Sequence, residues 1–131
     1  MTPVAERRLM RYIAPIGKML GLCDWKVILR PDEPDSKDHA ASISCVYGRR
    51  VANLWLSHGF EHLEPAEQRQ ILVHELLHVH FDSMTTLIEQ ALPPALGAPA
   101  YGVFDAAYRE RAEHAVDAIA EAVAPVFPLP E

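Results

Sequence analysis

The sequence predicts an α+β fold in a single domain spanning residues 1–131. Three observations support this prediction: helical spacing of apolar residues toward both ends of the chain, alternating apolar residues between them, and a length that suits one hydrophobic core. Half of the residues are hydrophobic, which is enough to build that core. The net charge of −6 argues against non-specific nucleic-acid binding, which requires a basic face.

The N-terminal half is expected to form one helix and a small sheet. Apolar spacing predicts the helix over residues 4–20, with a bend at Pro15. Strands are expected at 25–29, 42–47 and 51–57, with a tight turn between the last two. The simplest arrangement of these three strands is an antiparallel meander.

The C-terminal half is expected to be helical. A long helix is predicted over residues 64–83, because Pro65 suits the first helical position, and its apolar residues on every side predict a buried helix. A short helix can follow at 85–92, and the prolines and glycines of 93–102 predict a loop that acts as a lid or a connector. A last helix is expected over 103–124. Its predicted core stripe is Ala112, Val116, Ile119 and Val123.

The segment His74-Glu75-Leu76-Leu77-His78 lies within the long predicted helix. His74 and His78 are four residues apart, so their rings project from one helix face about 40° apart and can bind one zinc ion. Glu75 is offset by about 100° and can take a proton from a water molecule that the metal activates. The alternative is a chance pair of histidines, which the buried setting disfavours because unpaired charge is costly there.

A zinc hydrolase needs a third protein ligand and an open fourth position. The extended motif with a third histidine is absent, since Phe81 replaces its glycine and Met84 replaces its last histidine. A carboxylate on the last helix is therefore expected, and Glu113 lies at the centre of a polar stripe there. The other members of the stripe, which replace or support Glu113, are Glu110, His114 and Asp117.

Several assignments around this motif have alternatives. Asp117 can orient a ligand histidine from behind, but the polar stripe is also compatible with a solvated helix face paired with Arg109 and Arg111. Tyr101 and Tyr108 are weak candidates for stabilising an oxyanion, with core packing as the alternative. The strand predicted at 51–57 is a candidate cleft edge to which a peptide could add as a further strand.

The two motifs resemble those of the minimal gluzincins, and within them the ImmA/IrrE-type peptidases of phages and mobile elements. The resemblance rests on an H-E-x-x-H helix after a small sheet, and on Glu113 in a later helix, followed by small residues and ending near Pro125. It implies a zincin-like fold and hydrolysis of a peptide bond in a protein or peptide substrate, with Glu75 as general base. The implied zinc ligands are His74, His78 and Glu113.

Two other functions stay open. One is a non-catalytic interaction module stabilised by zinc, with phages as one source, and the other is an interaction protein without metal. No segment resembles a signal peptide or a membrane span, so we expect a cytoplasmic protein without membrane or direct nucleic-acid partners. Cys23 and Cys45 fit neither a disulfide framework nor a zinc-binding pattern, and we expect them to be reduced, with a single disulfide between them as the alternative.

Overall fold

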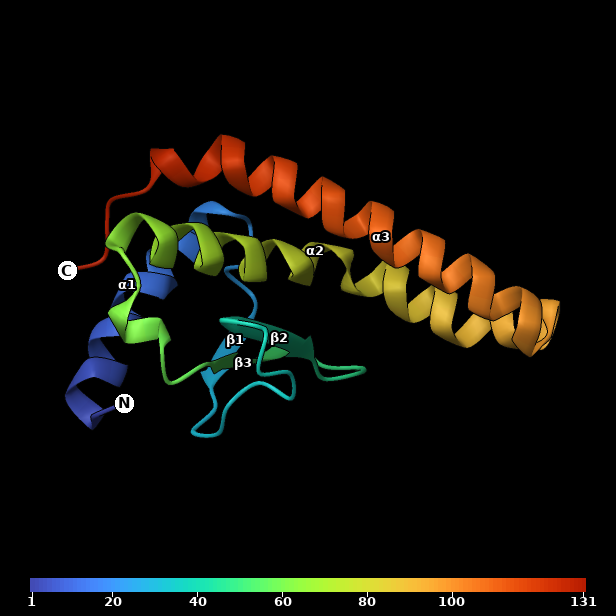
Figure 1. Cartoon of the computed structure of the whole chain (residues 1–131), viewed down its shortest axis with the longest axis horizontal. Coiled ribbons are helices and arrows are strands. Elements are labelled where there is room, and N and C mark those ends of the chain that lie inside the picture. Colours follow the sequence, from blue (N-terminus) through green and yellow to red (C-terminus); the bar gives the residue numbers. More distant parts are fainter.

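The computed structural model describes residues 1–131 as a three-stranded sheet packed against helices, with a long helical hairpin extending beyond the sheet (Figure 1). This confirms the α+β class. One cluster of 18 buried hydrophobic residues forms the core. The elements in chain order are α1 (Pro3–Met19), β1 (Lys26–Leu29), β2 (Ala41–Cys45), β3 (Val51–Leu56), the 3-10 helix η1 (Phe60–His62), α2 (Pro65–Leu96), α3 (Ala98–Val123) and the 3-10 helix η2 (Ala124–Val126).

Helix α1 is close to its predicted range. The side chain of Thr2 caps it by accepting a hydrogen bond from the backbone N–H of Ala5 at 3.2 Å. The helix continues through Pro15 to Met19, and the middle of its predicted apolar stripe is buried in the core. Val4, at the start of the stripe, is exposed.

The sheet is mixed, which corrects the predicted antiparallel meander. Its strand order is β1-β3-β2. Strands β2 and β3 pair antiparallel, with Ile43 opposite Leu54, but β1 pairs parallel to β3, with Val27 opposite Ala52. After β1, the loop of residues 30–40 leads to β2 at the far edge of the sheet. Strand β3 then occupies the central position between them, where its Ala52 and Leu54 are fully buried. Strand β2 is left at a sheet edge.

Helices α2 and α3 form one hairpin, which corrects the helix end predicted near residue 83. The loop predicted at 93–102 is helical except at Gly97, which adopts φ 80° and ψ 159°, a conformation open mainly to glycine. Pro99 is tolerated because the first turn of a helix leaves its N–H groups without intrahelical partners. The two adjacent prolines before Gly97 lie in the last turn of α2.

The hairpin is anchored to the core only through part of its length. Helix α2 begins with Pro65 at its first position, as predicted. The prediction that this helix is buried on every side was wrong. No residue between Val79 and Val116 is buried. On α3, Val116 is buried as predicted, whereas Ile119 is 40% exposed. None of the helices combines the length and the hydropathy that a membrane crossing requires. The buried residues of α2 are Leu72, Val73, Leu76, Leu77 and Val79.

Candidate metal centre

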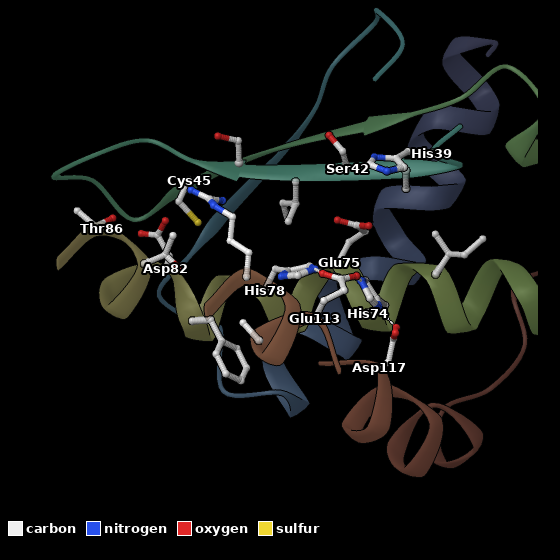
Figure 2. A pocket seen from close by; sticks show the side chains of 18 of the residues that line it. His39, Ser42, Cys45, His74, Glu75, His78, Asp82, Thr86, Glu113 and Asp117 are labelled. Carbon is white, nitrogen blue, oxygen red and sulfur yellow. Dashed lines mark hydrogen bonds and ion pairs between the residues drawn. The ribbon is translucent and has the colours of Figure 1, made fainter. Parts of the chain in front are cut away.

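A cleft of about 1020 Å³ separates β2 and the loop before it from helices α2 and α3. Figure 2 shows the two walls: Ser42 and Cys45 extend from the strand, and His74, Glu75 and His78 extend from α2. Glu113 enters the same space from α3. Strand β2 is an edge strand of the sheet and lies beside α2, so its free edge borders the cleft.

Three side chains converge at the helical wall of the cleft. The Nε2 atom of His74 lies 2.9 Å from Oε1 of Glu113, and Nε2 of His78 lies 3.2 Å from Oε2 of the same carboxylate. The two Nε2 atoms are 3.0 Å apart. This cluster of metal-binding side chains contains His74, His78 and Glu113, and all of their ligand atoms lie within 4.8 Å of one another.

These atoms suit a tetrahedral zinc ion. Ligands bound at about 2.0–2.1 Å in tetrahedral geometry stand about 3.4 Å apart, close to the three separations in the structure. The Nδ1 atom of His74 lies 2.8 Å from Oδ1 of Asp117, an acceptor, so a neutral His74 carries its proton on Nδ1. Its Nε2 lone pair then faces the carboxylate of Glu113, and a cation between these two acceptors relieves their repulsion. The donor set therefore fits the metal.

Asp117 occupies the position expected of a residue that orients a ligand. It lies one helical turn after Glu113, so both carboxylates face α2, and it contacts the ring nitrogen of His74 that points away from the cluster. Metal-binding histidines commonly donate their other N–H group to a carboxylate, which fixes both the tautomer and the ring plane.

Glu75 lies next to the three clustered side chains but is not one of them. It extends toward β2 in Figure 2, half-buried between the helix and the strand. The pKa of Glu75 is raised to about 7, mainly by burial and also by the negative charge of Glu113, while a hydrogen bond from the backbone of Ile43 acts in the opposite direction. The carboxylate can accept and release a proton near neutral pH.

His78 is held in the form that binds metals. Burial lowers its pKa, and the charge of His74 lowers it further, whereas Glu113 and Asp117 raise it. The neutral imidazole has a lone pair on one ring nitrogen, and that lone pair is what a metal ion requires. His80 lies elsewhere on the helix, and its ring nitrogen contacts the carbonyl oxygen of Leu20.

The other members of the predicted polar stripe lie outside the cluster. Glu110 and His114 are exposed and do not line the cleft. Arg109 does line it, and its guanidinium binds Asp105 at 2.8 Å and Glu89 at 2.6 Å. The stripe is therefore divided between a face that enters the cleft and a face in solvent.

Three further expectations about the site are corrected. The cleft edge is β2, not the strand predicted at 51–57, because β3 occupies the centre of the sheet. Tyr101 does not line the cleft, whereas Tyr108 does, with its hydroxyl 3.1 Å from that of Thr85. The segment 93–102 is a helical hairpin rather than a lid or a connecting loop.

Sequence analysis missed a second polar pair in the cleft. The thiol of Cys45 on β2 faces Asp82 on α2, and Figure 2 shows this pair at the left of the cleft, away from Glu113. Burial raises the pKa of Cys45 to about 12, and both the charge of Asp82 and its hydrogen bond with the thiol contribute. Asp82 is four residues after His78, which places it on the same helix face, but its partner could be found only from the sheet order.

Comparison with known proteins does not assign the chain to a family. No protein-family model matches it, and no curated protein or solved structure does either.

Proposed function

We propose that this protein is a zinc-dependent metallopeptidase of the gluzincin type. The observation that carries the proposal is the convergence of His74, His78 and Glu113 on one point, with Asp117 behind His74 and Glu75 beside it. These residues come from two helices in the order expected for ImmA/IrrE-type peptidases: a small sheet, the H-E-x-x-H helix, and a later helix with a glutamate.

The composition of the cluster favours catalysis over a purely structural site. Structural zinc sites usually have four protein ligands, whereas catalytic sites have three and keep one position open. The cluster contains three side chains. Asp117 does not complete it, because its carboxylate contacts Nδ1 of His74, the nitrogen that faces away from the other ligands.

The chain's own groups have defined roles in this proposal. A zinc ion in the site supplies a Lewis acid that polarises the peptide carbonyl and acidifies a water molecule. Glu75 takes a proton as water attacks the carbonyl carbon, and it delivers that proton to the leaving amine. Asp117 keeps the ring of His74 in one orientation, and the edge of β2 offers unpaired backbone groups to which an extended peptide can add.

The decisive experiment is a cleavage assay with zinc-loaded protein. A mixture of unstructured peptides is incubated with the wild type, with Glu75→Gln and with the control Glu67→Gln, which alters an exposed glutamate two turns earlier on α2. Mass spectrometry then identifies new termini. The proposal predicts cleavage by the wild type and the control, none after chelation, and at least a hundredfold loss in Glu75→Gln that still binds zinc.

Two outcomes would count against a peptidase. Equal cleavage by Glu75→Gln would show that the activity does not come from this site. A wild type that binds one zinc ion but cleaves no peptide would favour the second candidate, a non-catalytic module in which zinc fixes α2 to α3.

A further inference from the structure

The end of the α2–α3 hairpin is an unusual surface for this chain. We define the hairpin tip as residues 84–104; Figure 1 shows that it extends away from the sheet and from both chain termini. None of its 21 residues is buried. Residues 90–104 contain no charged side chain, although 23% of the whole chain is charged. The large exposed hydrophobic residues of the tip are Met84, Leu87, Leu96, Val103 and Phe104.

The exposed apolar residues of the tip follow a helix-packing pattern. On α2, Met84, Leu87, Ala91 and Ala95 are exposed at spacings of three, four and four residues. This is the spacing of an apolar stripe that packs against another helix. Packing of α2 against α3 does not cover this stripe, since its residues are exposed. Even Ile88, which lies elsewhere on the same part of α2, is only half-buried.

Two helices alone provide little enclosed core. Most of the stability of a helix in a protein comes from packing its apolar face, and the side chains of the tip make one hydrogen bond outside the hairpin, which the hydroxyl of Tyr47 donates to the side-chain oxygen of Gln90. Two such hairpins brought together would form a four-helix bundle and enclose these side chains.

The charge distribution favours a second copy of this chain as the partner. In a two-fold symmetric contact each patch meets the same patch, so a charged patch repels itself and an uncharged patch does not. The rest of this acidic chain repels its copies, which leaves the uncharged residues 90–104 of the tip as the favourable contact. A lipid surface is disfavoured, because no lysine or arginine occurs between Arg69 and Arg109 and the charges on either side of residues 90–104 are Glu89 and Asp105.

We therefore propose that the hairpin tip is a homodimer interface, in which α2 and α3 of two copies of this chain pack as a four-helix bundle. The proposal is independent of the metal centre. The tip begins beyond His78 and ends before Glu113, so it contains none of the three clustered side chains, although four of its residues line the far part of the same cleft: Thr85, Thr86, Glu89 and Gln90.

Sedimentation velocity on the full chain over a wide concentration series tests the proposal. The wild type should approach twice its 14.6 kDa mass as concentration rises. Val103→Glu and Leu87→Glu place carboxylates in the contact and should raise the dissociation constant at least tenfold. The matched control is Val126→Glu, since Val126 is 71% exposed and Val103 is 75% exposed. It should dimerise like the wild type, and circular dichroism should show unchanged helix content in all variants.

Three outcomes would overturn the proposal. A wild type that stays monomeric at every concentration would exclude the dimer. A dimer that resists both tip variants would place the contact on another surface. A monomer that co-sediments with neutral phosphatidylcholine vesicles, and loses this binding in Val103→Glu, would assign the tip to a lipid surface instead.

Discussion

The Nδ1 atom of His74 lies 2.8 Å from Asp117, while its Nε2 atom lies 2.9 Å from Glu113. Both nitrogens of one ring are therefore engaged by carboxylates from a single helix, and only one of those carboxylates faces His78. Glu113 is therefore the carboxylate that would bind zinc, and Asp117 is the one that would orient His74.

Asp117→Asn should weaken zinc binding by about 10–100-fold without abolishing it, because the ligands remain but His74 loses its charged orienting partner. Competition with a chromophoric chelator measures the affinity. Glu121→Gln, one turn further along α3, is the control and should bind zinc like the wild type. An affinity unchanged in Asp117→Asn would mean that the contact with His74 has no part in metal binding.

Glu75 should destabilise the metal-free protein at neutral and higher pH. Its pKa is about 7 in the folded state and 4.5 ordinarily, so the stabilising effect of its protonated form is complete below about pH 4.5 and is lost as pH rises through 7. Glu75→Gln should then raise the free energy of unfolding above pH 7 by an amount on the order of 3 kcal/mol. Urea denaturation in the presence of a chelator, at several pH values, measures this difference. A gain that is the same at low and high pH would contradict it.

Asp82 should control the reactivity of Cys45. In a Cys23→Ser background, Cys45 should react slowly with iodoacetamide at about pH 9, because its pKa of about 12 keeps the thiol protonated. Asp82→Asn removes the negative charge and should accelerate the reaction several-fold, although burial still holds the pKa above its ordinary value. The control is Asp38→Asn, elsewhere on the cleft wall. Equal rates in both variants would show that Asp82 does not act on the thiol.

Two glycines of the hairpin should respond to alanine in opposite directions. Gly97→Ala forces an alanine into φ 80° and ψ 159° and should lower the free energy of unfolding by about 1–3 kcal/mol. Gly102→Ala lies inside α3 and should raise it by up to about 1 kcal/mol, since alanine favours helix. Neither added Cβ meets another atom within 4 Å, so only the backbone differs. Thermal unfolding of both variants tests this, and a destabilised Gly102→Ala would contradict it.

Local patterns in the sequence identified much of the fold and the cleft. Pro65 marked the start of α2, apolar spacing located α1, and the i, i+4 spacing placed His74 and His78 on one face. The position of Glu113 in a polar stripe singled out the carboxylate that the structure brings to both histidines. Each of these inferences depends on residues within one helix.

The features that sequence analysis missed depend on contacts between distant segments. The parallel pairing of β1 follows from the path of the loop at 30–40, which has no local pattern. The prolines of 93–102 predicted a loop, but packing of α2 along α3 keeps both helices intact up to Gly97. The contact of Cys45 with Asp82 depends on β2 being the edge strand.

The most direct test of the account is the zinc content of the full chain after reconstitution and removal of free metal. We predict about one zinc ion in the wild type and in Glu110→Ala, which alters an exposed glutamate three residues from Glu113. Glu113→Ala should lose zinc under the same conditions, with its fold checked by circular dichroism. A wild type that retains no zinc, or a Glu113→Ala variant that binds it with unchanged affinity, would contradict the assignment of His74, His78 and Glu113 as a metal centre.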